Sequence, residues 1–419
     1  MKAELILYNI EELVTSREII EKKDSSNMEN IELLKNGYLA INQGKIIEVG
    51  SGSYPEALVD KNTKMVDLKN KTVIPGIVDS HTHLVHGGSR ENELTMKIKG
   101  VPYLEILKSG GGILSTVIAT RKATEKELVE KSLKILDRMA EYGVTTVESK
   151  SGYGLDLETE LKQLEVNKII NETHSLDVVS TFMGAHAIPT EFKGNKEGYI
   201  QELMKMMEVV KEKKLAEFCD IFCEDAVFTV EDSRRILMAA KDKGFKLKIH
   251  ADEIVSLGGA ELGAELGCIS ADHLMAISDL GIQKLKEKKI IANILPSTSF
   301  NLGKTYAPVR KMIDEGVEIA ISSDYNPGSS PCENIGIAMA ISCCGIRMTP
   351  LEIIKAVTIN GAKSLCLEDK IGSLEVGKDA DFVVFDKPNL EYIFYNFGVN
   401  NVEEVYKRGI KIVENGRKI

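Results

Sequence analysis

The sequence has no dense block of lysine or arginine, which limits the partners that the protein can have. Its 53 Lys and Arg residues are outnumbered by 63 Asp and Glu residues, so the formal net charge is −10. Proteins that bind nucleic acid usually carry a concentrated basic surface, and nucleic acid is therefore not an expected partner. The average field of an acidic protein also repels anions, so an anionic substrate would need a local cationic group to receive it.

The chain also lacks a C-x-x-C element and any apolar run long enough for a membrane span. Its seven cysteines, an odd number, favour a reduced cytosolic compartment over a disulfide framework. The longest weakly polar stretch, residues 335–346, is too short to cross a bilayer and predicts a buried helix. Residues 1–10 turn acidic too soon for a signal peptide. We therefore expect a cytoplasmic protein with no membrane partner.

The composition is otherwise that of a globular protein with more than one domain. Of the 419 residues, 43% are hydrophobic and 28% are charged. Short strand patterns separated by turns occur at both ends, over residues 4–8, 38–42, 45–49, 65–67, 381–385, 402–407 and 410–414, with a polar loop expected over residues 21–30. Neither end is large enough to fold alone. We predict that they pair into one small β domain, residues 1–71 plus 365–419, with residues 72–364 inserted between its halves.

The middle of the chain alternates apolar β-branched runs with segments of helical period. The eight runs cover residues 72–78, 144–149, 177–183, 220–223, 246–249, 268–271, 290–295 and 318–322. Between most of them lie amphipathic stretches, such as residues 125–142, 157–172, 199–213 and 230–243, each long enough for a right-handed crossover. Eight strand-then-helix units over about 250 residues specify a closed (β/α)₈ TIM barrel. The predicted fold class is therefore α/β.

Ionisable residues follow the C-terminal ends of these runs. They include six of the seven histidines and several carboxylates, namely His81, His83, His86, Glu148, His186, Glu224, Asp225, His250, His273 and Asp324. In a barrel the C-terminal ends of the strands converge on one mouth, where the chemistry takes place. Any one of these residues could be a polar strand terminator that reaches solvent, but the whole set indicates an active site.

Two of these histidines form the motif His81-Thr82-His83, in which a period of two places both imidazoles on one face. The motif alone is weak evidence, because it also occurs by accident. His250 and Asp324, at the ends of two other runs, complete a set of three His and one Asp. This set suits Zn²⁺ or another first-row ion with room for a solvent ligand. Such an ion lowers the pKa of a bound water from 15.7 to about 7, so the predicted chemistry is hydrolysis.

Hydrolysis also requires proton transfer and stabilisation of charge. Glu253, three residues after His250, is placed to shuttle a proton between water and a leaving nitrogen, although it would equally suit the N-terminus of a helix. Asp252 competes with Glu253 for this role, and spacing alone does not separate them. His273 is a candidate to polarise a carbonyl oxygen or to stabilise an oxyanion.

Two segments of the sequence resemble the signatures of the metal-dependent amidohydrolase superfamily. They are residues 75–84, which contain the His81-Thr82-His83 motif, and residues 372–381, which read GSLEVGKDAD. The resemblance implies a barrel with a small β-sandwich domain built from both termini. The dinuclear branch places a metal-bridging carboxylated lysine at the end of the fourth strand. Residues 221–224 occupy that position here and contain no lysine, which favours a site for a single metal.

The chain also resembles, over essentially its whole length, a branch of this superfamily that acts in histidine degradation. The similarity is carried by residues 87–93, 110–116, 148–154, 182–186, 250–253 and 324–329, with one departure, Ser323, where the resemblance leads us to expect threonine. It implies hydrolysis of the cyclic amide of 4-imidazolone-5-propanoate, a small anionic heterocycle, to N-formimidoyl-L-glutamate. It also implies a homodimer with one Zn²⁺ or Fe³⁺ per subunit.

Residue by residue, the resemblance places the metal on His81, His83, His250 and Asp324. It places the substrate on Arg90, Tyr153, His186, Glu253, Asn326, Gly328 and Ser329. Arg90 offers a bidentate fork to the propanoate, the cation that an acidic protein needs, while Tyr153 adds a hydroxyl and the turn over residues 326–329 adds amide donors. The glycines of residues 110–112 are not followed by P-loop residues, and they predict a mobile loop that covers the mouth.

The expected catalytic residues are Glu253, His273 and Asp324. Either Glu253 or Asp324 takes the proton from water, Glu253 then protonates the departing ring nitrogen, and His273 or His186 stabilises the oxyanion. The sequence does not decide whether Glu253 or Asp324 is the first base.

Two other functions remain as alternatives. Another single-metal amidohydrolase, such as a cytosine or guanine deaminase, would use the same ligands but would release ammonia. A catalytically inactive barrel that acts as an assembly scaffold would usually lack metal ligands, and all four are present here, which favours an enzyme.

Overall fold

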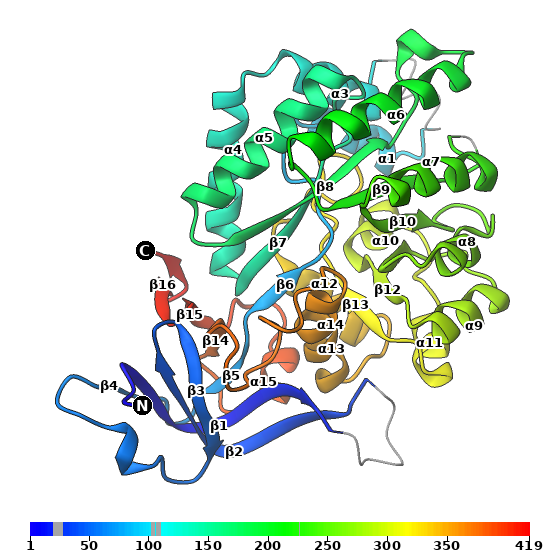
Figure 1. The fold of residues 1–419 in the computed structure, drawn as a ribbon. Coiled ribbons are helices and arrows are strands. Elements are labelled where there is room, and N and C mark those ends of the chain that lie inside the picture. The colour runs from blue at the N-terminus through cyan, green and yellow to red at the C-terminus, as the bar shows by residue number, and fades with distance from the viewer. Residues whose placement is uncertain (20–27, 102–104, 106–109, 226) are drawn as a thin grey trace.

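Eight parallel strands form a barrel, which confirms the predicted fold class (Figure 1). The computed structural model describes residues 1–19, 28–101, 105, 110–225 and 227–419. The barrel strands, in chain order and in sheet order, are β6 (Ile77–Asp79), β7 (Val144–Lys150), β8 (Asp177–Ala185), β9 (Phe218–Cys223), β10 (Lys246–Ala251), β11 (Ser270–His273), β12 (Ile291–Ile294) and β13 (Ile319–Ile321). Each pairs in parallel with the next one along the chain.

The segments that follow the first and last barrel strands, β6 and β13, are hydrogen-bonded to each other. The backbone N–H of Asp324 donates to the carbonyl of His81 at 3.0 Å, and that of His83 donates to the carbonyl of Tyr325 at 2.8 Å. Two segments that carry predicted metal ligands are thus hydrogen-bonded to each other at the mouth, although they lie more than 200 residues apart in the chain.

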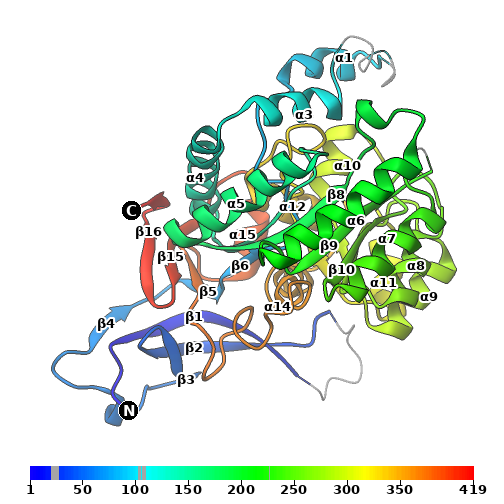
Figure 2. The same ribbon diagram turned by 45° about the horizontal axis from the view of Figure 1, so that its top comes forward.

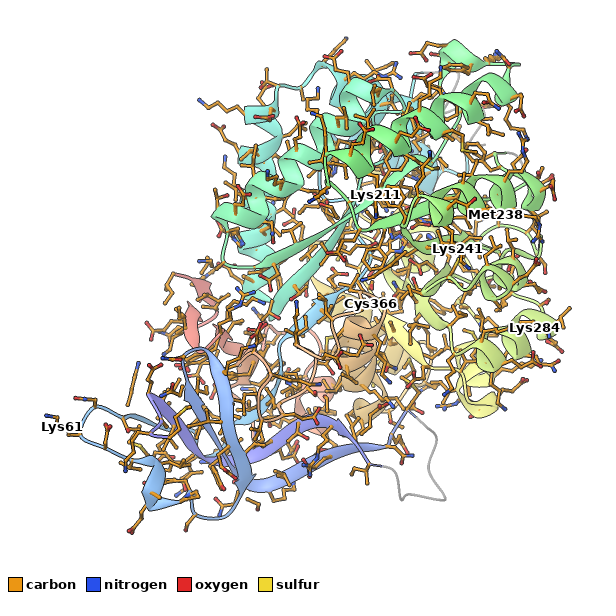
Figure 3. All side chains as sticks on the ribbon, viewed as in Figure 1. Lys61, Lys211, Met238, Lys241, Lys284 and Cys366 are labelled. Carbon is orange, nitrogen blue, oxygen red and sulfur yellow. The ribbon has the colours of Figure 1, made fainter. Side chains whose placement is uncertain are left out.

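Helices cover the outside of the barrel, and their outer faces carry lysines such as Lys211, Lys241 and Lys284 (Figures 2 and 3). They are α1 (Leu94–Ile98), α3 (Ile113–Lys122), α4 (Glu125–Glu141), α5 (Leu157–Thr173), α6 (Lys196–Glu212), α7 (Val230–Asp242), α8 (Gly259–Leu266), α9 (Asp279–Lys288), α10 (Pro296–Leu302), α11 (Val309–Glu315), α12 (Ile335–Cys344), α13 (Pro350–Val357), α14 (Ile359–Lys363) and α15 (Leu390–Tyr395), with 3-10 turns at Glu56–Leu58, Glu91–Glu93 and Thr190–Phe192. The four predicted amphipathic stretches correspond to α4–α7. Within the described residues, no helix is long and apolar enough to cross a membrane.

The two ends of the chain form one mostly antiparallel sheet, beside which both termini lie (Figures 1 and 2). Its strands are β1 (Leu5–Glu18), β2 (Ile31–Asn42), β3 (Lys45–Ser51), β4 (Lys64–Asp67), β5 (Thr72–Pro75), β14 (Phe382–Phe385), β15 (Val402–Lys407), β16 (Ile410–Glu414) and β17 (Arg417–Lys418). The pairing of β5 with β14 joins the N-terminal and C-terminal halves, as predicted. The polar loop expected over residues 21–30 lies largely outside the described residues. The exact domain boundaries stay a prediction.

The first predicted barrel strand, residues 72–78, is divided between the two sheets. Residues Thr72–Pro75 pair with β1 and β14 of the terminal sheet, and only Ile77–Asp79 belongs to the barrel. Gly76 lies between them, and a Cβ at this position would come within 2.3 Å of the Thr145 hydroxyl. The chain can therefore pass from one sheet to the other here only with glycine, which places the His81-Thr82-His83 motif directly above the barrel.

Candidate metal centre and active site

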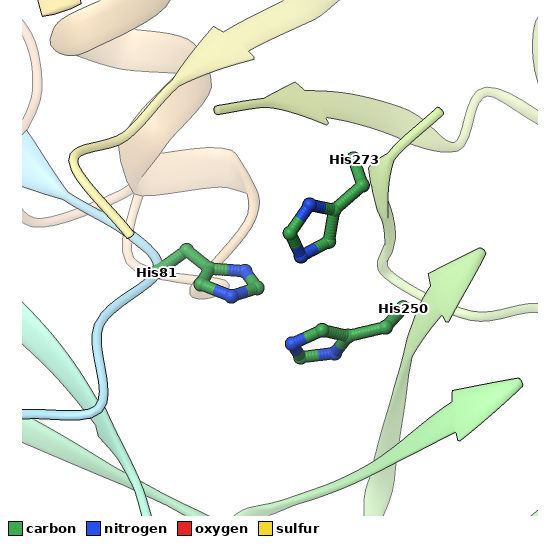
Figure 4. A group of neighbouring side chains, drawn as sticks. All are labelled: His81, His250 and His273. Atoms are coloured by element: carbon green, nitrogen blue, oxygen red, sulfur yellow. The ribbon is translucent and has the colours of Figure 1, made fainter. Parts of the chain in front are cut away.

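His250 and His273, from β10 and β11, and His81, from the segment after β6, point toward one another at the mouth (Figure 4). The ring centroids of His81 and His250 are 4.6 Å apart, and those of His250 and His273 are 5.1 Å apart. Ligand atoms of these three histidines all lie within 4.8 Å of one another, and the same holds for His81, His83 and Asp324. The four predicted ligands thus gather around His81, and His273 lies in the same cluster.

The free nitrogens of this cluster suit a metal ion. The Nε2 atom of His81 and both ring nitrogens of His250 are buried and have no hydrogen-bond partner in the described structure. His81 Nδ1 lies 2.5 Å from Oδ2 of Asp272, and His250 Nδ1 lies 3.1 Å from Oδ2 of Asp220. Carboxylates at Nδ1 favour a proton there and leave the lone pair of Nε2 for a ligand bond. Two imidazoles with this orientation and a nearby carboxylate, that of Asp324, are the donor set of a first-row metal site.

The electrostatics of the cluster follow from its burial. Burial, together with the charge of Lys150, lowers the pKa of His81 well below its usual value, and burial lowers that of His83 in the same way. For His250, burial is outweighed by the Asp220 carboxylate, which raises the pKa. Burial raises the pKa of Asp324 to about 6. Neutral imidazole is the form that binds metals, so His81 and His83 are already in the ligating state.

Asp324 is oriented by its neighbours on both sides. The Thr298 hydroxyl donates to Oδ2 at 2.5 Å, and Oδ1 lies 3.5 Å from Nε2 of His81 and 3.9 Å from Nε2 of His83. The residue has a left-handed backbone, φ 51°, and the side-chain amide of Asn326 donates to its carbonyl at 2.7 Å. One carboxylate oxygen is therefore held by a hydroxyl, while the other faces the histidines.

The structure shows which of the two neighbouring carboxylates, Asp252 or Glu253, can act as a proton shuttle. The fully buried carboxylate of Asp252 accepts from the backbone N–H groups of residues 257–260 at 2.9 to 3.2 Å, at the N-terminus of α8. Glu253 instead faces the mouth, with Oε2 lying 3.5 Å from Nε2 of His273 and 15% of its side chain exposed. Burial raises the pKa of Glu253 to about 7, with a further contribution from Asp324. Of the two carboxylates, Glu253 is the one with the position and the pKa of a proton shuttle.

A cavity of about 520 Å³ opens above the histidine cluster. Most of the predicted site residues line it, namely His83, Arg90, Tyr153, His186, His250, Glu253, His273, Asp324, Asn326, Gly328 and Ser329. Lys97 and Lys304 also contribute to its wall. The volume is within the usual range for a small-molecule site, and its cationic side supplies the local positive charge that an anionic substrate of an acidic protein requires.

Arg90 does not offer the free bidentate fork that the sequence suggested. Its Nε and Nη2 donate to the two carboxylate oxygens of Glu93, both at 2.8 Å. Glu93 also accepts from the backbone N–H of Gly112 at 2.7 Å and pairs with Lys97 at 3.2 Å. A Cβ at Gly328 would come within 2.2 Å of Nη1 of Arg90, so glycine makes room for the guanidinium. The Nη1 side of Arg90 is the side that approaches the cavity wall at residues 326–329.

Tyr153 and His186 lie beside His83, and hydrogen bonds to Glu160 fix the loop that carries Tyr153. The ring of His186 stacks on that of His83 at 4.7 Å, and the Tyr153 ring lies 5.6 Å from it. The loop turns at Gly152, where φ is 108°. The buried carboxylate of Glu160 accepts from backbone N–H groups on both sides of Tyr153, at residues 152, 154 and 155. Neither Glu160 nor Glu93 was recognised from the sequence as part of the site.

The turn over residues 326–329 uses its own amide donors. The backbone N–H groups of Gly328 and Ser329 donate to Oδ1 of Asn326 at 2.8 and 2.7 Å. They are therefore not available to a ligand as the sequence suggested, and the turn contributes shape instead. The loop expected over residues 110–112 is anchored through Gly112 to Glu93, and its mobility stays a prediction.

The comparisons agree with this geometry. The model of the Amidohydrolase family matches residues 72–412. The chain is 60% identical to an imidazolonepropionase of Fusobacterium nucleatum subsp. nucleatum over 409 residues, 98% of each chain, and 53% identical to one of Alkaliphilus metalliredigens over the full length of both. The chain belongs to the amidohydrolase family, among the imidazolonepropionases. An imidazolonepropionase of Streptococcus pyogenes is 50% identical over the full length of both chains.

Solved structures with the same fold include two deaminases. An adenosine deaminase from Xanthomonas campestris with bound zinc has a TM-score of 0.72 and 17% identity, covering 100% of this chain and 94% of its own. A guanine deaminase from C. acetobutylicum has a TM-score of 0.68 and 17% identity, covering 97% of this chain and 99% of its own. At this identity the likeness is one of fold. The family and the cluster of His and Asp side chains together support a single metal ion at the mouth.

Proposed function

We propose that this enzyme hydrolyses the cyclic amide C–N bond of 4-imidazolone-5-propanoate to N-formimidoyl-L-glutamate in histidine degradation. The observation that carries this function is identity of 50 to 60% to imidazolonepropionases over 98 to 100% of the chain. The test is to supply the freshly generated imidazolone to the metal-loaded protein and to follow loss of ring absorbance. Formation of N-formimidoyl-glutamate without ammonia is the expected result, whereas release of ammonia from guanine or cytosine would point to a deaminase.

We propose that His81, His83, His250 and Asp324 hold one Zn²⁺ or Fe³⁺. When bound, such an ion lowers the pKa of a water molecule toward neutrality and polarises the carbonyl that is attacked. Three imidazoles and one carboxylate suit zinc and iron comparably. Metal analysis of protein purified without added metal tests this proposal, with one equivalent per chain expected.

We propose that side chains next to the metal ligands carry out the proton transfers of the reaction. Glu253 is proposed as the base that takes the proton of the attacking water at its carboxylate and returns it to the departing ring nitrogen. The geometry favours Glu253 over Asp324, since one oxygen of Asp324 accepts from Thr298 and the other faces two histidines. His273, 3.5 Å from Glu253, is proposed to donate to the oxygen of the ring carbonyl as it becomes negative.

We propose that the substrate is held by other residues that line the cavity. Arg90 is proposed to receive the propanoate with the side of its guanidinium away from Glu93, with Lys97 adding charge and Tyr153 a hydroxyl. His186, Asn326, Gly328 and Ser329 complete the proposed wall around the ring. Because Glu93 fixes the Arg90 guanidinium before substrate binds, little entropy is lost when the carboxylate docks.

Arg90→Ala is expected to raise KM about 10- to 100-fold, because a hydrogen bond to a charged group contributes about 1.5 to 3 kcal/mol. The kcat and the metal content should change far less, since Arg90 is not one of the proposed metal ligands. Steady-state kinetics with metal analysis measure both. Arg138→Ala is the matched control, because Arg138 pairs with Glu333 at an exposed position. An unchanged KM in the Arg90 variant would remove Arg90 from the substrate site.

We also propose that two copies of the chain pair through an apolar groove whose lining residues differ from those of the active-site cavity. This groove has a volume of about 730 Å³ and lies between α12 and the segment that contains α15. The predicted buried helix forms as α12 but is not wholly buried, since Ile337 in the groove is 41% exposed. Phe300 and Phe397 beside it are 64% and 63% exposed. Apolar patches of this kind mark interaction surfaces, and the homodimer suggested by the resemblance would cover it.

Phe397→Asp is expected to convert a dimer into a monomer, because the charge would be desolvated in the contact. Sedimentation velocity measures the change, and Ile410→Asp serves as the control, because Ile410 lies in β16 of the terminal sheet, is 69% exposed and does not line the groove. A variant that remains dimeric would place the contact elsewhere.

A cytoplasmic location is also proposed, supported by seven cysteines that are all free thiols.

A further inference from the structure

A layer of charged side chains lies inside the barrel beneath the histidine cluster. It consists of Glu148 and Lys150 from β7, Asp220 from β9, Lys248 from β10 and Asp272 from β11, and each is 0% exposed. The alternation of a strand explains the pairs, because residues two apart on β7 both point inward. On β10 the same alternation places Lys248 beneath His250. Three carboxylates and two ammonium groups therefore share one closed interior.

Lys150 occupies the centre of this layer. Its Nζ lies 2.8 Å from Oε1 of Glu148, 2.8 Å from Oδ2 of Asp220 and 3.8 Å from Oδ2 of Asp272. Lys248 differs in its contacts. It lies 3.2 Å from Oε1 of Glu148 and donates to the Ser80 carbonyl at 3.2 Å, and its ion pairs among the described residues involve neither aspartate.

The two aspartates that form ion pairs with Lys150, Asp220 at hydrogen-bond distance and Asp272 at a longer distance, are the ones that contact the histidines. Asp272 uses Oδ2 both for Lys150 and for Nδ1 of His81, which lies 2.5 Å away. Oδ2 of Asp220 likewise lies within ion-pair distance of both groups, 2.8 Å from Nζ of Lys150 and 3.1 Å from Nδ1 of His250. One ammonium group is thus connected through two carboxylates to two imidazoles from different strands.

We propose that Lys150 is a positioning residue of the metal centre, which holds Asp220 and Asp272 so that His250 and His81 present Nε2 to one point. The inference rests on the metal site proposed above. Without the ammonium, three buried carboxylates would face one another with a single counter-charge, and the aspartates would have to reorient or take up protons. Carboxylates that hold metal-bound histidines contribute strongly to metal affinity. Lys150 acts on the metal centre through these carboxylates.

This role differs from that of the metal-bridging lysine in the dinuclear branch of the superfamily. Lys150 ends the second barrel strand and not the fourth. Its Nζ is surrounded by carboxylates, so an added carboxylate on that nitrogen would bring a further negative charge against them. The ammonium form is the one that the surroundings stabilise.

The test is the zinc affinity of reloaded protein, measured by competition with a chromophoric chelator and without substrate. Lys150→Met is expected to weaken zinc binding about 10- to 100-fold. Lys407→Met removes another buried lysine, one that pairs with Asp177 and Asp381 outside this layer, and should stay within about threefold of wild type. Asp220→Asn should also weaken binding, and adding Lys150→Met to it should cost less than Lys150→Met alone, because the two act in series. Wild-type affinity in Lys150→Met, or an equal loss in Lys407→Met, would overturn the proposal.

If Lys150→Met does not fold, the double variant Glu148→Gln/Lys150→Met is used instead, because it removes one charge of each sign. Its zinc affinity is compared with that of Glu148→Gln alone. The same 10- to 100-fold loss between these two variants is expected, and equal affinities would refute the role of Lys150. Because the readout is metal binding without turnover, a negative result leaves the proposed hydrolysis untouched, while failure of wild-type protein to open the imidazolone would leave the affinity comparison valid.

Discussion

His81→Asn is expected to abolish stoichiometric metal binding and to lower kcat by at least about 1,000-fold. His81 belongs to both groups of neighbouring ligand atoms at the mouth, so its loss affects every arrangement of the site. A catalytic metal contributes several kcal/mol of transition-state stabilisation, and each 1.4 kcal/mol corresponds to about a factor of ten in rate. Metal analysis after dialysis and turnover of the imidazolone measure the two effects.

The matched control for this variant is His174→Asn. His174 belongs neither to the cavity lining nor to the groups of neighbouring ligand atoms, and its Nε2 lies 3.2 Å from Oδ1 of Asp137 on α4. This variant should keep its metal and its rate. A His81 variant that retains one equivalent of tightly bound metal and wild-type kcat would refute the metal centre.

Glu253→Gln is expected to lower kcat about 100- to 10,000-fold while the metal stays bound, because the amide can neither accept nor return a proton. The variant removes charge with little change in shape, and Glu253 is not among the proposed metal ligands. Kinetics on protein of known metal content measure the effect. Should the variant retain its rate, the proton would have to pass through Asp324.

The pH dependence provides a second measure of Glu253. Its pKa is raised to about 7 by burial, so the carboxylate that accepts the proton is lost as the pH falls through 7. Wild-type kcat should therefore decline on the acidic side with a midpoint near pH 7, and Glu253→Gln should lack this limb. In Asp252→Asn the limb should remain while the melting temperature falls, since Asp252 accepts four backbone hydrogen bonds at α8.

The barrel could be predicted from the sequence because periodicity and strand ends are local properties. Each of the eight runs contains or overlaps a barrel strand, and the four amphipathic stretches coincide with α4–α7. The gathering of His81, His83, His250 and Asp324 followed from the same pattern, because parallel strands of a closed barrel end at one mouth. Their roles as ligands remain to be tested by the experiments above.

Details of the site that depend on side-chain direction could not be predicted in the same way. Asp252 and Glu253 are adjacent in the chain, and only the left-handed backbone at Asp252, φ 50°, directs one carboxylate to α8 and leaves the other at the cavity. The guanidinium of Arg90 was recognised, but its partner Glu93 was not, since an arginine three residues before a glutamate is common on protein surfaces.

The sequence by itself determined the order of strands and helices, the pairing of the chain ends, and the convergence of histidines and carboxylates on one mouth. These follow from alternation along a strand and from the rule that parallel strands end on the same side. Only the tertiary structure decided which carboxylate holds which imidazole, as in the contact between His81 and Asp272 across 191 residues. Such partners meet through barrel closure, and their distance in space has no counterpart in their spacing along the chain.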